Sequence, residues 1–147
     1  MVTTRRQARE WAIQILTAAD LNPAVSAEEA IADFWAQLPT LERDEGGTDG
    51  QLPRGKIKAF AEERVIGVLA RSAEIDAVLA DLLKDWDVER LGTVERAVLR
   101  MGIWEMKFSD VPKPVVINEA IDLANWFSTP KSRALVNGVL DRFAKSL

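Results

Sequence analysis

The chain has 147 residues, the size of one ordinary domain, and 48% of them are apolar, which is enough to build a core. It carries 19 Lys and Arg against 23 Asp and Glu, and this formal charge of −4 argues against a wholly basic nucleic-acid coat but not against a local basic patch. Because His and Cys are absent, thiolate nucleophiles, imidazole bases, Ser-His-Asp triads and Cys/His zinc sites are excluded. We therefore expect a protein without enzymatic activity, cofactor or metal, although carboxylate pairs and oxygen-ligated cations stay open.

The same composition bears on where the protein works. A chain without Cys suits a reducing compartment. The first ten residues lack an apolar secretory core, and no apolar run approaches the length that spans a membrane. We expect a cytoplasmic protein with no membrane partner.

Helical periodicity starts at the N-terminus. Apolar residues recur at three- and four-residue spacing over residues 8–19 and again over 27–38, which predicts two amphipathic helices. Asn22-Pro23 separates them, because proline restricts the residue before it and removes a backbone donor. Ser26 and Glu29 have the spacing of a capping box, so the second helix is expected to begin there.

Residues 39–55 have a different composition, with four acids among four Gly. A solvated, mobile loop is the favoured interpretation, since the spacing does not match a calcium-binding EF-hand loop. Beyond it, apolar stripes predict five more helices, over residues 57–69, 75–86, 94–108, 117–124 and 132–143. Pro130 suits the first position of the last helix, with Thr129 as its cap. No strand pattern or fixed-period repeat occurs, so the fold class is all-α.

Three arginines, Arg5, Arg6 and Arg9, gather at the start of the first helix. Guanidinium groups bind phosphates bidentately and stack on bases, so this cluster is a candidate RNA-binding arm. The residues alone favour the plainer interpretation, a solvated helix face, because short basic motifs are weak signals.

The start of the last helix is a second candidate for RNA binding. Its free amides favour a phosphate, nearby aromatics could stack unpaired bases, and the cations could hold the backbone. The alternative is that the aromatics pack in the core and a hydroxyl caps the helix. The candidate residues are Asn125, Trp126, Phe127, Ser128, Thr129, Lys131 and Ser132.

Two acids of the helix over 94–108 also stand out. Glu105 falls near the apolar stripe, so we expect it to be partly buried and hydrogen-bonded, with a structural role favoured over a catalytic one. Glu95 and Arg96 lie in the first turn, where they either complement the helix dipole or form a charged docking point. The residues leave these two alternatives open.

Several motifs in a fixed order are more specific than any of these features. They run from Leu91 to Met101, add Glu105 and Asp110-Val111-Pro112, continue from Val116 to Ala124 and end with Val136 to Asp141. Together with the arginine-rich opening, they closely resemble the NusB family of transcription antitermination factors over nearly the whole chain.

The resemblance implies two small three-helix bundles with a seventh helix, forming one RNA-binding domain over residues 1–147. It also implies a non-enzymatic role. NusB proteins pair with the small-subunit ribosomal protein that serves as NusE, and the pair recognises the single-stranded boxA element of nascent ribosomal RNA transcripts. RNA polymerase carrying that assembly resists termination.

By position, the resemblance places Arg5, Arg6 and Arg9 in the family's RNA-facing arm and residues 125–132 at its RNA-facing helix junction. It places Thr17, Glu95 and Arg96 on the side that faces the protein partner. Thr17 stands where the family has a tyrosine, so part of that contact must differ. Lys131 stands where relatives often carry an acid, which predicts stronger RNA binding.

Two other functions stay open. The same fold occurs as an RNA-binding appendage of ribosomal RNA methyltransferases, but no Gly-rich cofactor-binding domain follows Leu147. The chain could also be a plain helical interaction module, such as a homodimer formed through Trp-rich faces, that binds no RNA.

Overall fold

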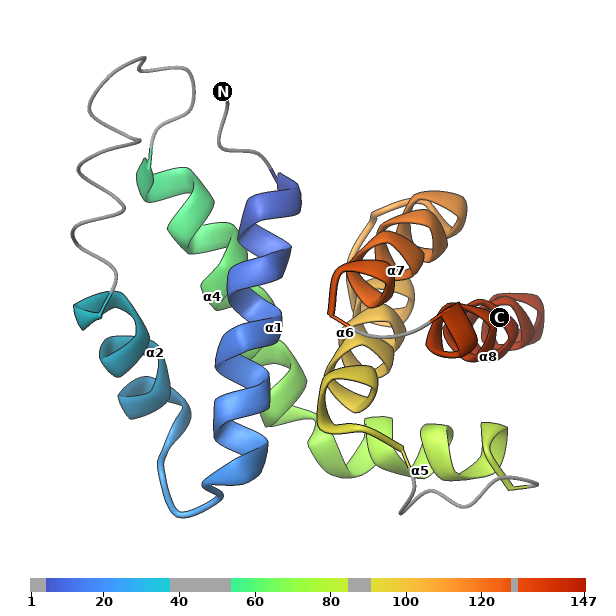
Figure 1. Cartoon of the computed structure of the whole chain (residues 1–147), viewed down its shortest axis with the longest axis horizontal. Coiled ribbons are helices and arrows are strands. Elements are labelled where there is room, and N and C mark those ends of the chain that lie inside the picture. Colours follow the sequence, from blue (N-terminus) through green and yellow to red (C-terminus); the bar gives the residue numbers. More distant parts are fainter. Residues whose placement is uncertain (1–4, 38–53, 85–90, 128–129) are drawn as a thin grey trace. The chain divides into compact units, whose positions relative to one another are not determined.

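The computed structural model describes residues 5–37, 54–84, 91–127 and 130–147 (Figure 1). In these ranges the chain forms seven helices and no strand, which confirms the all-α prediction. They are α1 (Arg5–Leu21), α2 (Ala27–Ala36), α4 (Arg54–Ala70), α5 (Ser72–Leu82), α6 (Thr93–Phe108), α7 (Lys113–Phe127) and α8 (Pro130–Ser146). The chain divides into two compact units, Met1–Ile66 and Gly67–Leu147, and the boundary falls inside α4.

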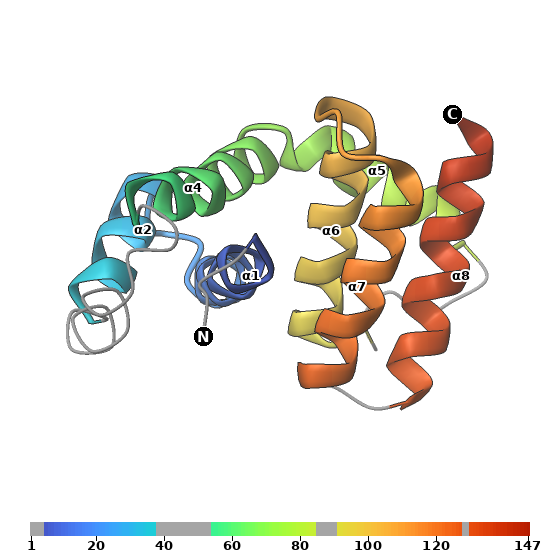
Figure 2. The same cartoon turned by 90° about the horizontal axis from the view of Figure 1, so that it is seen from above.

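Unit 1 is built on α1, which packs against α2 (Figures 1 and 2). The predicted apolar face of α1 is buried throughout, from Ala8 and Trp11 to Ala19. The helix ends at Leu21, and the Asn22 amide turns back to the Ala19 carbonyl at 3.2 Å before Pro23 prevents continuation. The expected break between the first two helices is therefore confirmed.

The capping box of α2 is also confirmed. The Ser26 hydroxyl accepts the Glu29 amide at 3.1 Å, and the Glu29 carboxylate accepts the Ser26 amide at 3.3 Å. These reciprocal bonds satisfy amides that have no intrahelical partner. The cap sets the direction in which α2 leaves the turn, and Ile31 of α2 is then buried.

The start of α4 differs from the prediction. Arg54 and Gly55 were expected to belong to the loop over 39–55, whereas the helix already begins at Arg54. A glycine is tolerated there because the first turn of a helix makes few intrahelical hydrogen bonds from its amides. Residues 38–53, and with them most of the predicted loop, lie outside the described residues.

Unit 2 centres on α6, which packs against α5, α7 and α8 (Figure 2). Its middle is buried on several sides, from Ala97 through Met106 with Arg100 excepted. Gly102 allows the close approach of α8, because a Cβ at that position would lie 2.9 Å from a Leu140 methyl group. On the other side, Arg100 binds Asp76 of α5 through two hydrogen bonds of 2.8 and 2.9 Å.

The helix α7 is longer than predicted. We expected it over residues 117–124, after a break at Pro112 and Pro114, but it begins at Lys113. Pro114 is accommodated in the first turn, where its missing amide donor is not needed. Pro130 opens α8 as predicted, while its predicted cap, Thr129, lies outside the described residues.

Candidate nucleic-acid interface

Three guanidinium groups surround one aromatic ring in unit 1. The ring belongs to Phe60 of α4, and the guanidinium carbons of Arg64, Arg9 and Arg5 lie 3.5, 5.2 and 5.7 Å from its centre. Each distance is within the range of cation–π attraction. We call Arg5, Arg9, Phe60 and Arg64 the arginine cluster.

The members of the arginine cluster differ in exposure. Arg9 and Arg64 are 3% and 2% exposed, whereas Arg5 is open to solvent. The structure therefore corrects the interpretation of the three arginines as one solvated helix face, while the RNA contact of Arg9 stays a prediction. Arg9 lies three and four residues before Ala12 and Ile13, both of which are buried, so it shares their face of α1. Its aliphatic stem packs in the unit while its guanidinium reaches the ring.

The third predicted arginine, Arg6, is half-buried beside Glu10. Burial raises the pKa of the Glu10 carboxyl, and the nearby Arg6 charge lowers it by a smaller amount. Gln7 also donates to Glu10, at 3.3 Å. Part of the Arg6 charge is therefore balanced within α1, which leaves Arg5 as the most accessible of the three predicted cations.

Sequence reasoning missed Phe60 and Arg64. The signal was present, because Arg64 follows Phe60 by four residues and lies between the buried Ala61 and Val65. A cation inside an apolar stripe requires a partner. Here the Arg64 guanidinium has the Phe60 ring and the Glu63 carboxylate, the latter at 2.7 Å.

At the start of α8 the predicted residues separate into two groups. Lys131 and Arg133 are exposed, as is Asn125 near the end of α7. Ser132 is only 4% exposed and its hydroxyl donates to the Glu95 carboxylate. Its RNA contact stays a prediction. Ser132 points inward because it precedes the buried Val136 by one turn.

Four of the predicted RNA-binding residues cannot be compared with the structure. Ser128 and Thr129 lie outside the described residues. Trp126 and Phe127 complete the backbone of α7, but their side chains are likewise outside the described part.

The residues predicted to face a protein partner are partly enclosed. Glu95, which was predicted either to complement the helix dipole or to form a charged docking point, is half-buried, and one of its oxygens accepts a hydrogen bond from the Gly92 amide at 2.7 Å. The other oxygen accepts the Ser132 hydroxyl, so a charge reversal here would also break the cap of α6. Arg96 is half-buried. Thr17 is half-buried too, and its hydroxyl oxygen is buried with no hydrogen-bond partner among the described residues.

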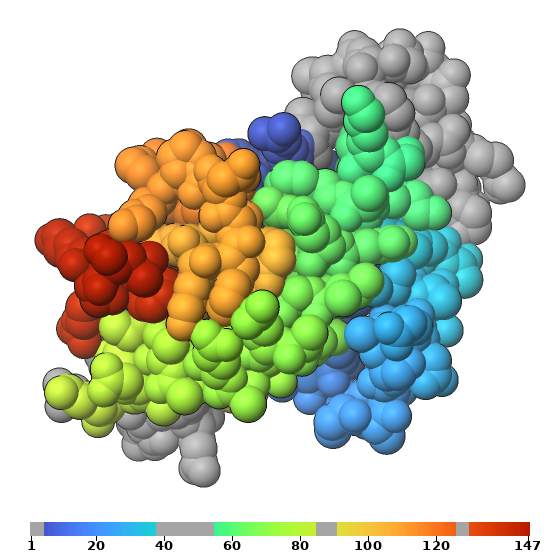
Figure 3. All heavy atoms as spheres, turned by 180° about the vertical axis from the view of Figure 1, so that it is seen from behind, coloured from blue at the N-terminus to red at the C-terminus, as the bar shows by residue number. Residues whose placement is uncertain are grey.

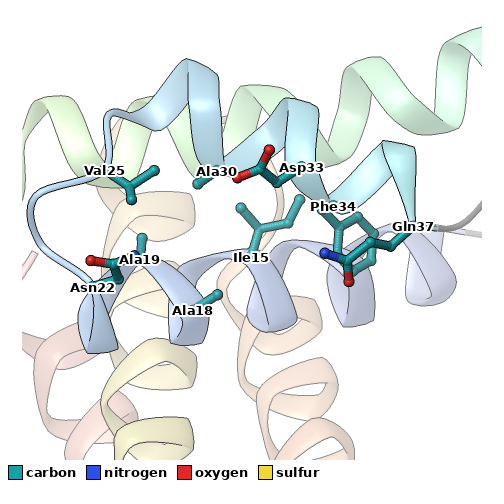
Figure 4. A pocket seen from close by; sticks show the side chains of 9 residues that line it. All are labelled: Ile15, Ala18, Ala19, Asn22, Val25, Ala30, Asp33, Phe34 and Gln37. Carbon is teal, nitrogen blue, oxygen red and sulfur yellow. The ribbon is translucent and has the colours of Figure 1, made fainter.

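Other sites in the described residues offer little chemistry. Glu105 is 1% exposed, so its predicted burial is confirmed. A pocket of about 210 Å³ opens between α1 and α2 (Figure 4). Its lining is mostly apolar, and Asp33 is its single titratable group. Within the described ranges, no three acidic, His or Cys side chains come together to hold a metal. None of the helices described combines the length and the hydropathy that a membrane-spanning segment requires.

The chain matches a known protein family over almost its whole length. Residues 6–145 match the model of the NusB family. The chain belongs to the NusB family. The transcription antitermination protein NusB of Sorangium cellulosum is 37% identical over 144 residues, which cover 97% of this chain and 93% of that protein. The transcription antitermination protein NusB of Koribacter versatilis is also 37% identical, over 145 residues that cover 98% of this chain and 90% of that protein.

Solved structures of NusB proteins agree with the fold. The structure of T. maritima NusB is 29% identical and aligns with a TM-score of 0.79 over 99% of this chain and 93% of its own. A crystal structure of the antitermination factors NusB and NusE in complex with dsRNA aligns with a TM-score of 0.76 at 26% identity, covering 97% of both chains. The family resemblance seen in the motifs is therefore confirmed.

Proposed function

We propose that this NusB-family chain is a non-enzymatic transcription antitermination factor that acts in the cytoplasm. It pairs with the ribosomal protein NusE and binds boxA-type single-stranded RNA in nascent ribosomal RNA transcripts. The observation that carries the proposal is the arginine cluster, in which Arg5 lies at the surface with its guanidinium against the half-buried ring of Phe60.

The arginine cluster is built for phosphate binding. Arg5 presents a planar guanidinium fork that matches phosphate oxygens. Its stem is ordered by the contact of its guanidinium with Phe60, so less conformational entropy is lost when RNA binds. Lys131 and Arg133 add two exposed cations in the first turn of α8, where free amides also favour an anion.

The experiment is a titration of the chain with a boxA-type single-stranded RNA, with and without the ribosomal partner, in parallel with the same sequence as a duplex. We expect binding of the single strand that strengthens when the partner is added. Replacing Arg5 by Ala should weaken the binding of the single strand. It should also lower the slope of log affinity against log salt concentration by about 0.7 for each phosphate that the arginine neutralises. Tighter binding of the duplex would overturn the choice of single-stranded RNA.

The same titration separates the two alternatives. A helical interaction module would bind the ribosomal protein or itself without any affinity for RNA. An appendage of a ribosomal RNA methyltransferase would bind RNA equally well with and without the ribosomal protein. Either result would contradict the proposed function.

Thr17 gives a test of the partner surface. Valine keeps the shape of threonine but removes the hydroxyl, which has no partner within the described residues. Thr17→Val should therefore leave the free energy of unfolding unchanged or raise it by about 1–3 kcal/mol. If NusE supplies the missing hydrogen bond, its affinity should fall by about 0.5–1.5 kcal/mol, measured by calorimetry. Unchanged affinity would place Thr17 outside the partner contact.

A further inference from the structure

We propose that the pocket between α1 and α2 is a docking site for a basic protein segment, which inserts one apolar side chain into it. This inference goes beyond the proposed function, because it assigns a protein contact to a part of unit 1 that RNA binding leaves unused. Three observations carry it: the apolar lining of the pocket, the polar groups at its rim and the acidic charge around it.

The lining of the pocket is apolar and encloses a small volume. Ile15 lies in the middle of the lining, with Phe34 towards one end and Val25 towards the other (Figure 4). The volume of about 210 Å³ is below the range of about 300–1,000 Å³ that is usual for small-molecule sites. A pocket of this size suits one large apolar side chain, and protein interfaces are commonly anchored by single side chains of this kind.

Apolar surface continues from the pocket to the end of α1. Leu21 follows Ala18 of the lining by three residues, so the two side chains are neighbours on the surface of the helix. At 71%, Leu21 is the most exposed of the large apolar side chains in the described part of the chain. The turn from α1 to α2, in mid-blue in Figure 3, lies at the surface. One partner segment could therefore cover Leu21 and fill the pocket.

Three polar side chains at the rim of the pocket are available to a ligand. They belong to Asn22, Asp33 and Gln37, and all three residues are exposed. Within the described residues, none of these side chains has a hydrogen bond or an ion pair. Amide and carboxylate oxygens accept hydrogen bonds from ammonium and guanidinium groups. The rim therefore favours an apolar side chain that has a lysine or an arginine next to it.

The charge around the pocket is acidic. Residues 10–37 contain no Lys or Arg, and their acids are Glu10, Asp20, Glu28, Glu29 and Asp33. Lys58 of α4 does contact α2, but it lies over the Trp35 ring. Trp35 follows Asp33 by two residues, so it points to another side of α2. Negative charge around an apolar pocket attracts a basic protein segment and repels RNA.

The pocket is separate from the sites that the proposed function uses on α1. Thr17 follows Ile15 of the lining by two residues, a rotation of about 200°, so it points to the opposite side of the helix. Arg5 begins α1 and lies about 20 Å from Ala18 along the helix axis. RNA at the arginine cluster and a protein segment at the pocket can therefore bind at the same time.

The test uses the full chain and a synthetic peptide as the probe. The peptide has blocked ends and the sequence Lys-Lys-Leu-Phe-Lys-Lys, and its control carries glutamate in place of every lysine. Binding is followed by NMR through the methyl signals of Ile15, Val25 and Ala30, which line the pocket. We expect the basic peptide to shift these signals and the acidic peptide to leave them in place. Added salt should weaken the binding, because it screens exposed charges.

Two variants test whether the peptide occupies the pocket. Asp33→Lys should lower its affinity by on the order of fivefold, because an attraction like that of an exposed ion pair becomes a repulsion. The matched control, Asp81→Lys, makes the same charge change at an exposed acid of α5 and should have little effect. Ala30→Leu should prevent binding by filling the pocket. Thermal unfolding checks that the variants are folded, which we expect of Asp33→Lys because lysine favours helices more than aspartate does.

Several results would overturn the inference. One is a basic peptide that leaves the methyl signals in place at millimolar concentration, and another is an acidic peptide that binds equally well. Shifts of the same signals by boxA-type RNA alone would assign the pocket to the RNA surface, and shifts that follow the protein concentration alone would assign it to a second copy of the chain. None of these results depends on the RNA affinity of Arg5→Ala, so this inference and the proposed function can fail separately.

Discussion

At the scale of single residues, Arg5 and Arg9 lie one turn apart in α1 but differ in burial. Arg9→Ala removes a buried stem and a desolvated cation–π contact, so we expect a loss of about 2 kcal/mol in the free energy of unfolding. Arg5→Ala should cost less than about 1 kcal/mol, because its contact with Phe60 is solvent-exposed. Urea denaturation followed by circular dichroism measures both.

The RNA affinities of the same two variants should run in the opposite order. Arg5→Ala should lower the salt slope of RNA binding, while any loss in Arg9→Ala should follow its loss of stability. A folded Arg9→Ala variant with a reduced salt slope would show that Arg9 reaches the RNA from its buried position.

The neighbours Ser132 and Lys131 give a second contrast at this scale. Ser132→Ala leaves the Glu95 carboxylate without one of its donors, so we expect a loss of about 1.5–3 kcal/mol in stability. Lys131→Asp places an acid at an exposed helix start and should leave stability unchanged or raise it by about 0.3–1 kcal/mol. It should nevertheless weaken RNA binding, since a carboxylate repels phosphate. Equal RNA affinity at low salt, where charge effects are least screened, would show that Lys131 faces away from the RNA.

At the scale of helices, α4 and α6 meet closely where Gly67 faces Trp104. A Cβ at position 67 would lie 2.3 Å from the Trp104 indole nitrogen, so Gly67→Ala forces the ring or the helix to move. We expect a loss of about 1–3 kcal/mol. The control is Gly138→Ala in α8, where nothing lies within 4 Å of the added carbon and alanine should gain about 0.5–1 kcal/mol. Thermal unfolding distinguishes the two, and a stable Gly67→Ala variant would mean that the indole has room to turn.

Periodicity predicted most helices because each has one buried face, as α1 shows from Ala8 to Ala19. The capping box of Ser26 and Glu29 was equally predictable, since both partners are close in sequence. The starts of α4 and α7 were wrong by several residues because Gly and Pro are ordinarily breakers. Both are tolerated in a first turn, which periodicity cannot detect.

The site was less predictable than the helices. The basic character of residues 5–9 was visible, and the spacing of Arg9 to Ala12 and Ile13 already put it on the buried face of α1, but the ring that it meets belongs to Phe60 of α4, more than fifty residues away. The hydroxyl of Ser132 likewise finds its acceptor, Glu95, on another helix. Local patterns can show which face a side chain shares, but they contain no information about such distant partners.

At the scale of the whole molecule, the absence of His and Cys predicts a flat pH response. Ordinary carboxyls titrate near pH 4 and lysines near pH 10, so almost no side chain changes charge between about pH 6 and about pH 8. Both stability and RNA affinity should stay nearly constant over that interval, measured by denaturation and by RNA titration. A clear transition of stability or RNA affinity within that interval would contradict this prediction.

Below that pH interval, protonation of two acids should change the stability of the fold in opposite directions. The pKa of Glu74 is lowered, first by its hydrogen bond from Lys107, so its contribution to stability is present above the unfolded pKa and is lost as the pH falls through the folded pKa. The pKa of Glu10 is raised by burial, so its ionised form disfavours the fold and its protonation on acidification is favourable. Lys107→Met should move the Glu74 titration, followed by NMR, towards the ordinary value.

The edge-on contact of Trp11 with Trp35 makes unit 1 optically distinct. The two indoles lie 5.3 Å apart at 88°, one on α1 and the other on α2, and they are two of the five tryptophans of a chain that has no tyrosine. Chromophores this close exchange excitation, and the coupling disappears as soon as the two helices separate. The difference in circular dichroism between the chain and a Trp35→Phe variant separates this pair from the other three tryptophans and supplies a reporter of the α1–α2 contact, with no label attached.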